Sequence, residues 1–291
     1  MLARPATAPR EPDATPAPVH GAAAPPATGS AEALPSGWQA ATAWRRLQGQ
    51  LRDPPVRQAV RERAVQAVVE RAQALVRHAA RPMRVVEAGW PEAGDLDLEA
   101  TLERPRPWAP EDLRLVRRVP READVVAVLD MSLSMTGEKI ALVAVATAIL
   151  RMKLEHVAVV AFDTVPHVLV RAGEVLPIRE VVRRVLEVPA QGYTNIEGGL
   201  VAGREQLRRG RRRERVGLCF TDGVANVGAD PTRAAFTFPR LHLVHVGDHH
   251  PQGARACLAM ARAGRGRLYR ARAYQDLPDV VRRAVRELFR S

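Results

Sequence analysis

The chain has 291 residues, of which 46% are hydrophobic and 26% are charged. That length fits one large domain or two small ones, and the composition excludes a chain that is disordered throughout. The formal net charge is +12, and almost all basic residues are arginines, because only Lys139 and Lys153 are lysines. A composition rich in Ala, Arg and Pro can reflect the coding genome, so the charge alone is weak evidence for a nucleic-acid partner.

Residues 1–36 form a Pro/Ala-rich tail without hydrophobic periodicity, which cannot bury a core and is predicted to be disordered. Residues 37–82 follow a helical pattern that Asp53-Pro54-Pro55 interrupts, so we expect a helical hairpin with one apolar face. We expect that apolar face either to pack on the rest of the chain or to serve as a docking surface for a partner protein.

Residues 83–121 are predicted to form a β-containing connector. The segment from Asp95 to Leu102 alternates between polar and apolar positions, which predicts a half-buried strand, and residues 112–119 could pair with it. The acidic outer positions of that strand are either solvated or bind a cation or a basic partner.

Residues 122–291 alternate between strand and helix patterns, which predicts a doubly wound α/β domain with a mostly parallel sheet. Strands are expected at 124–130, 156–162, 166–171, 215–220, 241–247 and 266–271. Helices are expected at 137–153, 177–187, 195–209, 252–263 and 275–289. The connection between the second and third strands is short enough for an antiparallel pair, so we expect one antiparallel strand at the edge of the sheet.

The two cysteines and the distribution of apolar residues indicate the compartment. Cys219 lies in an apolar run and Cys257 in a helical pattern, and no CxxC or Cys/His cluster is present. This excludes a zinc or disulfide framework and predicts buried free thiols in a reducing compartment. No stretch reaches the roughly 18 apolar residues of a membrane span, and the N-terminus lacks the apolar segment of a signal peptide. We therefore expect a cytoplasmic protein without a membrane partner.

The most informative motif follows the apolar strand at 124–130, which is typical of a strand buried on both faces. The strand ends in Asp-x-Ser-x-Ser, with candidate ligands Asp130, Ser132 and Ser134. Polar side chains at the carboxyl end of such a strand lie where open α/β sheets place their ligand sites. One carboxylate and two hydroxyls there predict a hard-cation site for Mg²⁺, Mn²⁺ or Ca²⁺.

Two later segments offer further oxygen ligands. Thr194 lies in a Gly-x-Thr-Asn loop, and Asp222 lies in Phe-Thr-Asp-Gly after the strand at 215–220. The three segments, in this order along an alternating strand–helix pattern, resemble the von Willebrand factor A (VWA) domain over residues 122–291. The resemblance implies a Rossmann-like fold with a metal-ion-dependent adhesion site.

By that resemblance Ser132, Ser134 and Thr194 would contact Mg²⁺ through their hydroxyls, while Asp130 and Asp222 would hold it directly or through water. Mg²⁺ takes six oxygen ligands, so an acidic side chain of another protein can complete its shell. The resemblance thus implies a non-catalytic protein-interaction module rather than an enzyme. Many family members have Gly between the two serines. This chain has Leu133 there, and the larger side chain could restrict a partner's approach.

These residues also have structural interpretations. Ser134 or Thr136 could cap the helix after the first motif, and Thr194 or Asn195 could cap the helix after the loop. Asp163, at the end of the second strand, could support the cation ligands from behind, but it is interpreted as a turn residue.

The layout resembles cytoplasmic bacterial proteins that partner MoxR-type AAA+ ATPases. It resembles the integrin-like part of magnesium-chelatase D subunits less closely, since the chain has no AAA+ remnant. One alternative is a metal-dependent phosphohydrolase with Asp130 as nucleophile, but Ser132 stands where haloacid-dehalogenase-type phosphatases need a second Asp. No nucleophile elbow or P-loop is present either. The other alternative is nucleic-acid binding through the run Arg208–Arg215, where the absence of interleaved aromatic residues argues against base stacking.

Overall fold

The structure is a computed structural model that describes residues 36–77, 83–103, 109–132, 138–189, 192–247 and 251–288. The tail predicted at residues 1–36 lies outside this part of the chain, except for Ser36. The Ser36 hydroxyl accepts a hydrogen bond from the Gln39 N–H and so caps the first helix.

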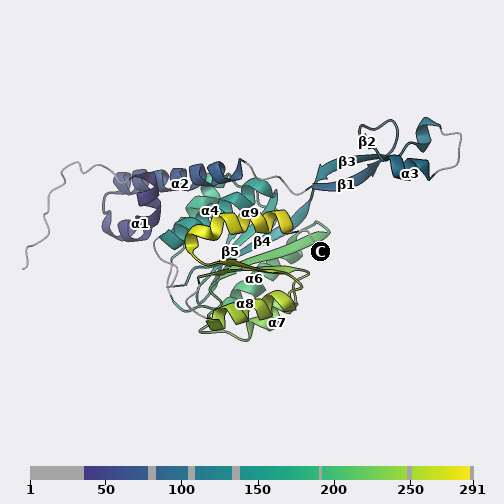
Figure 1. The fold of residues 1–291 in the computed structure, drawn as a ribbon. Coiled ribbons are helices and arrows are strands. Elements are labelled where there is room, and N and C mark those ends of the chain that lie inside the picture. The colour runs from purple at the N-terminus through teal and green to yellow at the C-terminus, as the bar shows by residue number, and fades with distance from the viewer. Residues whose placement is uncertain are drawn as a thin grey trace, which may run out of the picture. The chain divides into compact units, whose positions relative to one another are not determined.

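A six-stranded sheet forms the centre of the α/β domain (Figure 1). Its order is β6-β5-β4-β7-β8-β9, and all neighbours are parallel except β5 and β6, which are antiparallel. The strands are β4 (Ala123–Asp130), β5 (His156–Phe162), β6 (Pro166–Val170), β7 (Glu214–Thr221), β8 (Leu241–Val246) and β9 (Leu268–Ala271). This arrangement confirms the predicted doubly wound fold with one antiparallel edge strand.

Helices cover both faces of this sheet (Figure 1). One face carries α4 (Glu138–Lys153), α5 (Ile178–Glu187) and α9 (Leu277–Glu287). The other carries α6 (Ile196–Arg209), α7 (Pro231–Phe236) and α8 (Pro251–Ala263). The short helix α7 was not predicted, although Asp230 caps it and Pro231 occupies its first position, a common way to begin a helix.

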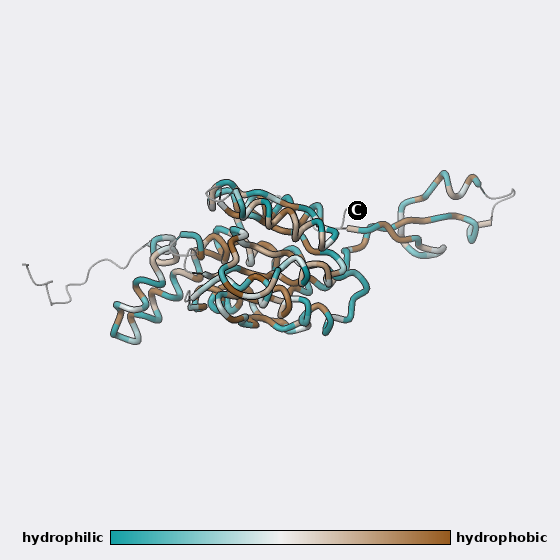
Figure 2. The backbone as a smooth tube through the Cα atoms, turned by 90° about the horizontal axis from the view of Figure 1, so that it is seen from below, coloured by the Kyte–Doolittle hydropathy of each residue, from teal (hydrophilic) through white to brown (hydrophobic). Residues whose placement is uncertain are grey.

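The central strand β4 supplies both cores, because successive side chains of a strand point to opposite faces. Val125, Ala127 and Leu129 pack with α4, and Val126 and Val128 pack under α6. All eight residues of β4 are buried, as its continuous apolar sequence predicts. Figure 2 shows the same distribution, with hydrophobic segments mostly inside the domain and hydrophilic ones mostly along its outer helices.

The predicted helical hairpin consists of α1 (Gly37–Gln50) and α2 (Pro54–Val76) and packs on α4. Trp44 and Val68 of the hairpin are almost fully buried and belong to the same hydrophobic core as α4. This explains why the middle of α4 is apolar all round: one side faces the sheet and the other faces the hairpin. The apolar face of the hairpin is therefore occupied by the chain's own domain.

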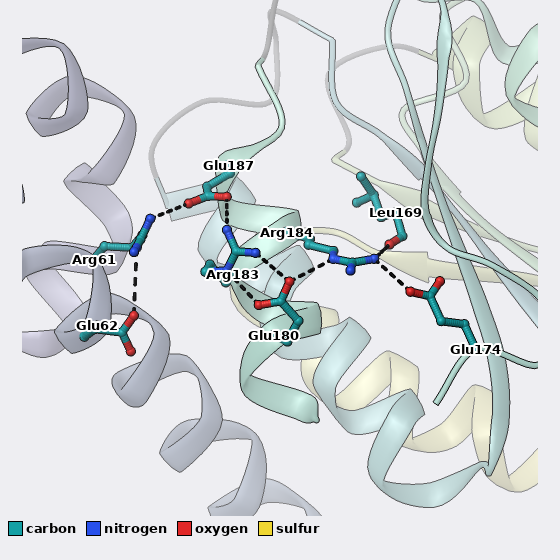
Figure 3. Close-up of polar contacts among 8 residues, drawn as sticks. All are labelled: Arg61, Glu62, Leu169, Glu174, Glu180, Arg183, Arg184 and Glu187. Carbon is teal, nitrogen blue, oxygen red and sulfur yellow. Dashed lines mark hydrogen bonds and ion pairs between the residues drawn. The ribbon is translucent and has the colours of Figure 1, made fainter. Parts of the chain in front are cut away.

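A chain of ion pairs joins the hairpin to α5 (Figure 3). Arg61 of α2 contacts Glu187 at 3.0 Å, and Glu187 contacts Arg183 at 2.6 Å. Hydrogen bonding to Arg183, and then to Arg184, lowers the pKa of Glu180 to about 2. These side chains are partly exposed, and exposed ion pairs contribute less than about 1 kcal/mol each, so the buried apolar contacts hold the hairpin in place.

Residues 83–120 form a second, three-stranded antiparallel sheet, here called the ribbon (Figure 1). It contains β1 (Met83–Ala88), β2 (Asp95–Leu96), α3 (Leu98–Leu102) and β3 (Leu115–Pro120), with β3 in the centre.

The prediction of one strand from Asp95 to Leu102 was wrong, because the strand stops at Leu96. The Asp97 carboxylate accepts a hydrogen bond from the Ala100 N–H and starts α3 instead, a local capping contact that competes with strand pairing. The main partner of β3 is β1, which the sequence analysis did not predict.

Candidate functional site

The carboxyl ends of β4 and β7 lie side by side at one edge of the large sheet. The two strands are parallel neighbours, and their register pairs Leu129 with Phe220. Asp130 and Thr221, the last residues of the two strands, therefore lie next to each other, and Asp222 follows directly. This is the edge where ligand sites of open α/β sheets form.

Asp130 is buried, and both of its carboxylate oxygens accept hydrogen bonds. Its Oδ1 accepts from the Ser132 N–H at 3.1 Å, and its Oδ2 accepts from the Thr221 hydroxyl at 2.7 Å. Burial raises its pKa to about 6, the Thr221 hydrogen bond opposes that rise, and the nearby charge of Asp222 adds to it. Two carboxylates thus lie close together in a region where burial disfavours negative charge.

The loop before α6 brings Thr194 into this region. Asn195 caps α6, because its Oδ1 accepts from the Gly198 N–H at 2.9 Å. Of the two cap candidates in this loop, Asn195 is the residue that performs the task, and Thr194 has no capping role. Thr194 is 5% exposed, and its backbone is held by Asn226, whose N–H donates to the Thr194 carbonyl at 3.0 Å.

The loop after β7 contains the candidate ligand Asp222 and also contacts the candidate ligand Thr194. It runs from Asp222, whose Oδ1 accepts from the Val224 N–H, to Asn226, which contacts Thr194. Gly223 has φ +79° and packs against the Gly253 carbonyl at the start of α8. A side chain at that position would be strained by the backbone and would collide with α8, so glycine is required there.

The helical hairpin reaches the other end of the Thr194 loop. Arg45 of α1 donates a hydrogen bond to the carbonyl of Val188, the residue that ends α5. Burial lowers the pKa of Arg45 to about 10, and the charge of Asp163 opposes that shift. Asp163 is a turn residue, as predicted. Its Oδ1 accepts from the Val165 N–H at 3.0 Å, and its carbonyl accepts from the Asn195 N–H at 2.8 Å.

Four of the five predicted ligands lie in the described part of the chain: Asp130, Ser132, Thr194 and Asp222. Ser134, with Thr136 and the rest of 133–137, lies outside the described residues. Cys219 and Cys257 are buried free thiols, as expected, and burial raises the pKa of both, that of Cys257 to about 12.

Two residues of this region, Thr221 and Asn226, were not predicted as part of the site. Thr221 stands in the quoted Phe-Thr-Asp-Gly segment, and its position opposite Asp130 follows once β4 and β7 are known to be neighbours. Asn226 contacts Thr194 through loop geometry that no local sequence signal announces.

The donor set fits a hard divalent cation. Its buried members are a carboxylate and hydroxyl-bearing residues, with the second carboxylate only partly buried. Within the described ranges, no three His, Cys, Asp or Glu side chains cluster as they do in most zinc sites. Oxygen donors of this kind suit Mg²⁺, Mn²⁺ or Ca²⁺, and a cation would offset the two neighbouring carboxylates.

Comparison with known protein families shows which family this chain is related to. Residues 61–236, more than half of the chain, match the family described as "VWA domain containing CoxE-like protein". The chain belongs to this CoxE-like VWA family. The match covers most of α2, the ribbon and the sheet through β7, so it includes all the candidate ligands of the VWA domain. A comparison with curated proteins found no match.

Solved structures similar to this VWA protein share little sequence with it. Proximal thread matrix protein 1 from the mussel byssus is 18% identical, with a TM-score of 0.49, over 57% of this chain and 48% of that chain. A form of the same mussel protein described as having a zinc-occupied MIDAS motif is 16% identical, with the same TM-score and the same coverage of both chains. A von Willebrand factor type A protein from Catenulispora acidiphila is 15% identical, with a TM-score of 0.49, over 72% of this chain and 51% of that one. This chain thus spans about half the length of these proteins.

None of the helices in the described ranges is long and apolar enough to cross a membrane.

Proposed function

We propose that this VWA domain is a non-catalytic module that binds another protein through a divalent cation, with Mg²⁺ as the first candidate. The observation that carries the proposal is that Asp130 and Asp222 lie together at one edge of the sheet, while Asn226, four residues after Asp222, donates a hydrogen bond to the Thr194 carbonyl. Ser132 and Ser134 complete the proposed ligand set. When bound, the cation would offer a free coordination position to an acidic side chain of the partner.

The residues around Asp130 also support a binding role over a catalytic one, because a phosphohydrolase of the haloacid-dehalogenase type needs a second acidic residue two positions after its nucleophile. No second acidic residue follows two positions later, because Ser132 stands there.

The proposed partner is a MoxR-type AAA+ ATPase, for which this chain would act as an adaptor. This part of the proposal rests on the layout of a helical region before a VWA domain in a chain without an ATPase domain of its own.

Calorimetric titration of the chelator-treated protein with Mg²⁺, Mn²⁺ and Ca²⁺ tests the cation site. Asp222→Asn should weaken binding at least ~10-fold, as loss of a charged ligand does. Asp279→Asn serves as the matched control, because Asp279 is an exposed residue of α9. Pull-down of the ATPase in Mg²⁺ and in EDTA tests the adaptor role. Failure to capture the ATPase in Mg²⁺ would refute the adaptor role, and binding that survives both EDTA and the double variant Ser132→Ala/Ser134→Ala would refute its dependence on the cation site.

A further inference from the structure

The ribbon exposes more apolar surface than its small core explains. Among its described residues only Ala88, Thr101 and Leu115 are buried. Six of its large apolar side chains stay exposed by about half: Met83 and Val85 in β1, and then Trp90, Leu96, Leu98 and Leu102. A small antiparallel sheet with so little buried surface is marginally stable alone, and contiguous exposed apolar surface is typical of an interaction site.

The part of the ribbon that carries the last four of these side chains is acidic although the chain is basic. Residues 87–112, here called the ribbon tip, contain eight carboxylates and two arginines, a net charge of −6 in a chain of +12. The remainder of the chain therefore carries +18. On α3 the pairs Leu98 and Leu102, and Glu99 and Glu103, lie at i and i+4 and so form neighbouring apolar and acidic stripes. Neither glutamate forms an ion pair with any residue in the described ranges.

A surface of complementary character lies over α6 and α7, which pack against each other. Val201 is 52% and Phe236 is 65% exposed. Arg204, three residues after Val201, donates to the carbonyl of Thr237 at 2.7 Å, which places the two exposed apolar side chains in one neighbourhood. We call this surface the α6–α7 face.

The arginines of the α6–α7 face bind backbone carbonyls. Arg204 contacts the Thr237 carbonyl, and Arg265 donates to the Phe236 carbonyl at 3.0 Å and lies 5.4 Å from the Phe236 ring centroid. A carbonyl orients a guanidinium but does not neutralise it, so their positive charge remains available to a partner. Exposed Arg233 adds to it, and so does exposed Arg208, although Arg208 shares its charge with Glu205, which lies 3.9 Å away on the same helix.

We propose that the ribbon tip of one molecule docks on the α6–α7 face of a second copy. The leucines of α3 would cover Val201 and Phe236, and the glutamates would meet the surrounding arginines. Both halves of this contact lie in the same chain, and their apolar and charged characters match. Complementary charge of this kind selects a partner and its orientation. The contact involves two different surfaces, so repetition gives an exchanged dimer, a ring or an open chain.

Sedimentation velocity of the full chain tests this, in EDTA so that the proposed cation site plays no part. The wild type should associate in a concentration-dependent way. The ribbon variant Glu99→Arg/Glu103→Arg and the face variant Arg208→Glu/Arg233→Glu should each weaken association at least ~10-fold, because like charges would then oppose each other. An equimolar mixture of the two variants should associate again, since each then offers a complementary surface to the other.

Controls separate docking from general effects of charge or folding. Arg52→Glu/Arg57→Glu changes the net charge as the face variant does but lies on the hairpin, and it should associate like the wild type. Leu98→Ser removes an exposed apolar contact without changing charge and should weaken association. In 1 M salt, where the Debye length is about 3 Å, the charge variants should differ less from the wild type.

A wild type that stays monomeric at all concentrations would overturn the proposal, and so would unchanged association of Leu98→Ser. Failure of the mixed variants to associate would also overturn it. A monomer whose tryptophan fluorescence changes in the face variant, but no longer does so once Trp90 is replaced by Phe, would show docking within one molecule and would overturn the second-copy assignment.

Discussion

Replacing Asp130 by Asn distinguishes a carboxylate that stabilises the fold from one held ready for a cation. The substitution keeps the shape of the side chain and removes its charge. The Asn oxygen can still accept from the Ser132 N–H, and the Asn amide can donate to the Thr221 hydroxyl, which is a donor to Asp130 in the wild type. Most of the polar contacts therefore survive, and the main change is the loss of a buried negative charge.

The magnitude follows from the pKa of Asp130, which burial raises from 3.8 to about 6. Because the folded-state pKa exceeds the unfolded-state value, ionisation opposes folding as pH rises from 3.8 to about 6, and the whole penalty is present at pH 7.5. That difference corresponds to about 3 kcal/mol. Allowing for imperfect amide contacts, we expect metal-free Asp130→Asn to be more stable than the wild type by about 1–3 kcal/mol at pH 7.5. The gain should shrink toward pH 4.

Urea unfolding followed by circular dichroism, in EDTA and in Mg²⁺, measures both parts of this prediction. Mg²⁺ at 100 times its dissociation constant should stabilise the wild type by about 2.7 kcal/mol and should leave Asp130→Asn unchanged. A variant that is less stable than the wild type in EDTA would refute the reasoning, because Asp130 would then be a structural acceptor. Stabilisation of the variant by Mg²⁺ would equally contradict the assignment of Asp130 as a ligand.

Three further predictions concern the fold around the site. Val68→Ala, in the buried face of the hairpin, should lower the free energy of unfolding by about 1–3 kcal/mol, whereas Glu187→Gln should lower it by less than about 1 kcal/mol, as chemical denaturation would measure. Thr221→Val removes the hydroxyl that donates to Asp130 and should destabilise the chelator-treated protein by about 1–3 kcal/mol at pH 7.5, as thermal unfolding would detect. Burial lowers the pKa of His242 from 6.5 to about 4, so its contribution to stability is complete above pH 6.5 and is lost as pH falls toward 4. The loss should reach about 3 kcal/mol and be absent in His242→Gln, as the difference between the two stability–pH curves would show.

The sequence predicted the α/β domain well because its central strands are mostly apolar runs and its longer helices show a helical spacing of apolar residues. β5, for example, begins and ends where its sequence His156–Phe162 predicted. The ribbon was predicted poorly for a physical reason. The segment that starts at Asp95 has the polar–apolar alternation of a strand. In so small a sheet a longer strand would bury little apolar surface, so the capping contact of Asp97 starts a helix instead. β1 escaped prediction because Met83–Ala88 is mostly exposed and lacks a clear alternation.

For the site, the candidate ligands could be predicted from the sequence, but most of the residues that contact them could not. Asp130 and Asp222 could be paired from the sequence, because the ends of parallel strands meet at one edge. The contact of Asn226 with Thr194 could not, since it joins two irregular loops whose paths depend on tertiary packing. The choice of Asn195 over Thr194 as helix cap was likewise undecidable, because both residues are good caps.

These loop contacts bear on how the proposed cation site would work. Asn226 lies in the loop that follows Asp222 and donates a hydrogen bond to the Thr194 carbonyl, which connects the two loops. Thr221, at the end of β7, donates to the Asp130 carboxylate at the end of β4. The protein itself therefore holds these segments together. The conformational entropy that is lost on bringing them together is lost when the chain folds, and not when the cation binds. A cation that enters such a site needs little rearrangement of these segments. The affinity of the site for the cation should then depend on the charges of Asp130 and Asp222 more than on ordering of the loops. Such a preorganised site can hold the cation while one coordination position stays open to a ligand from a partner protein.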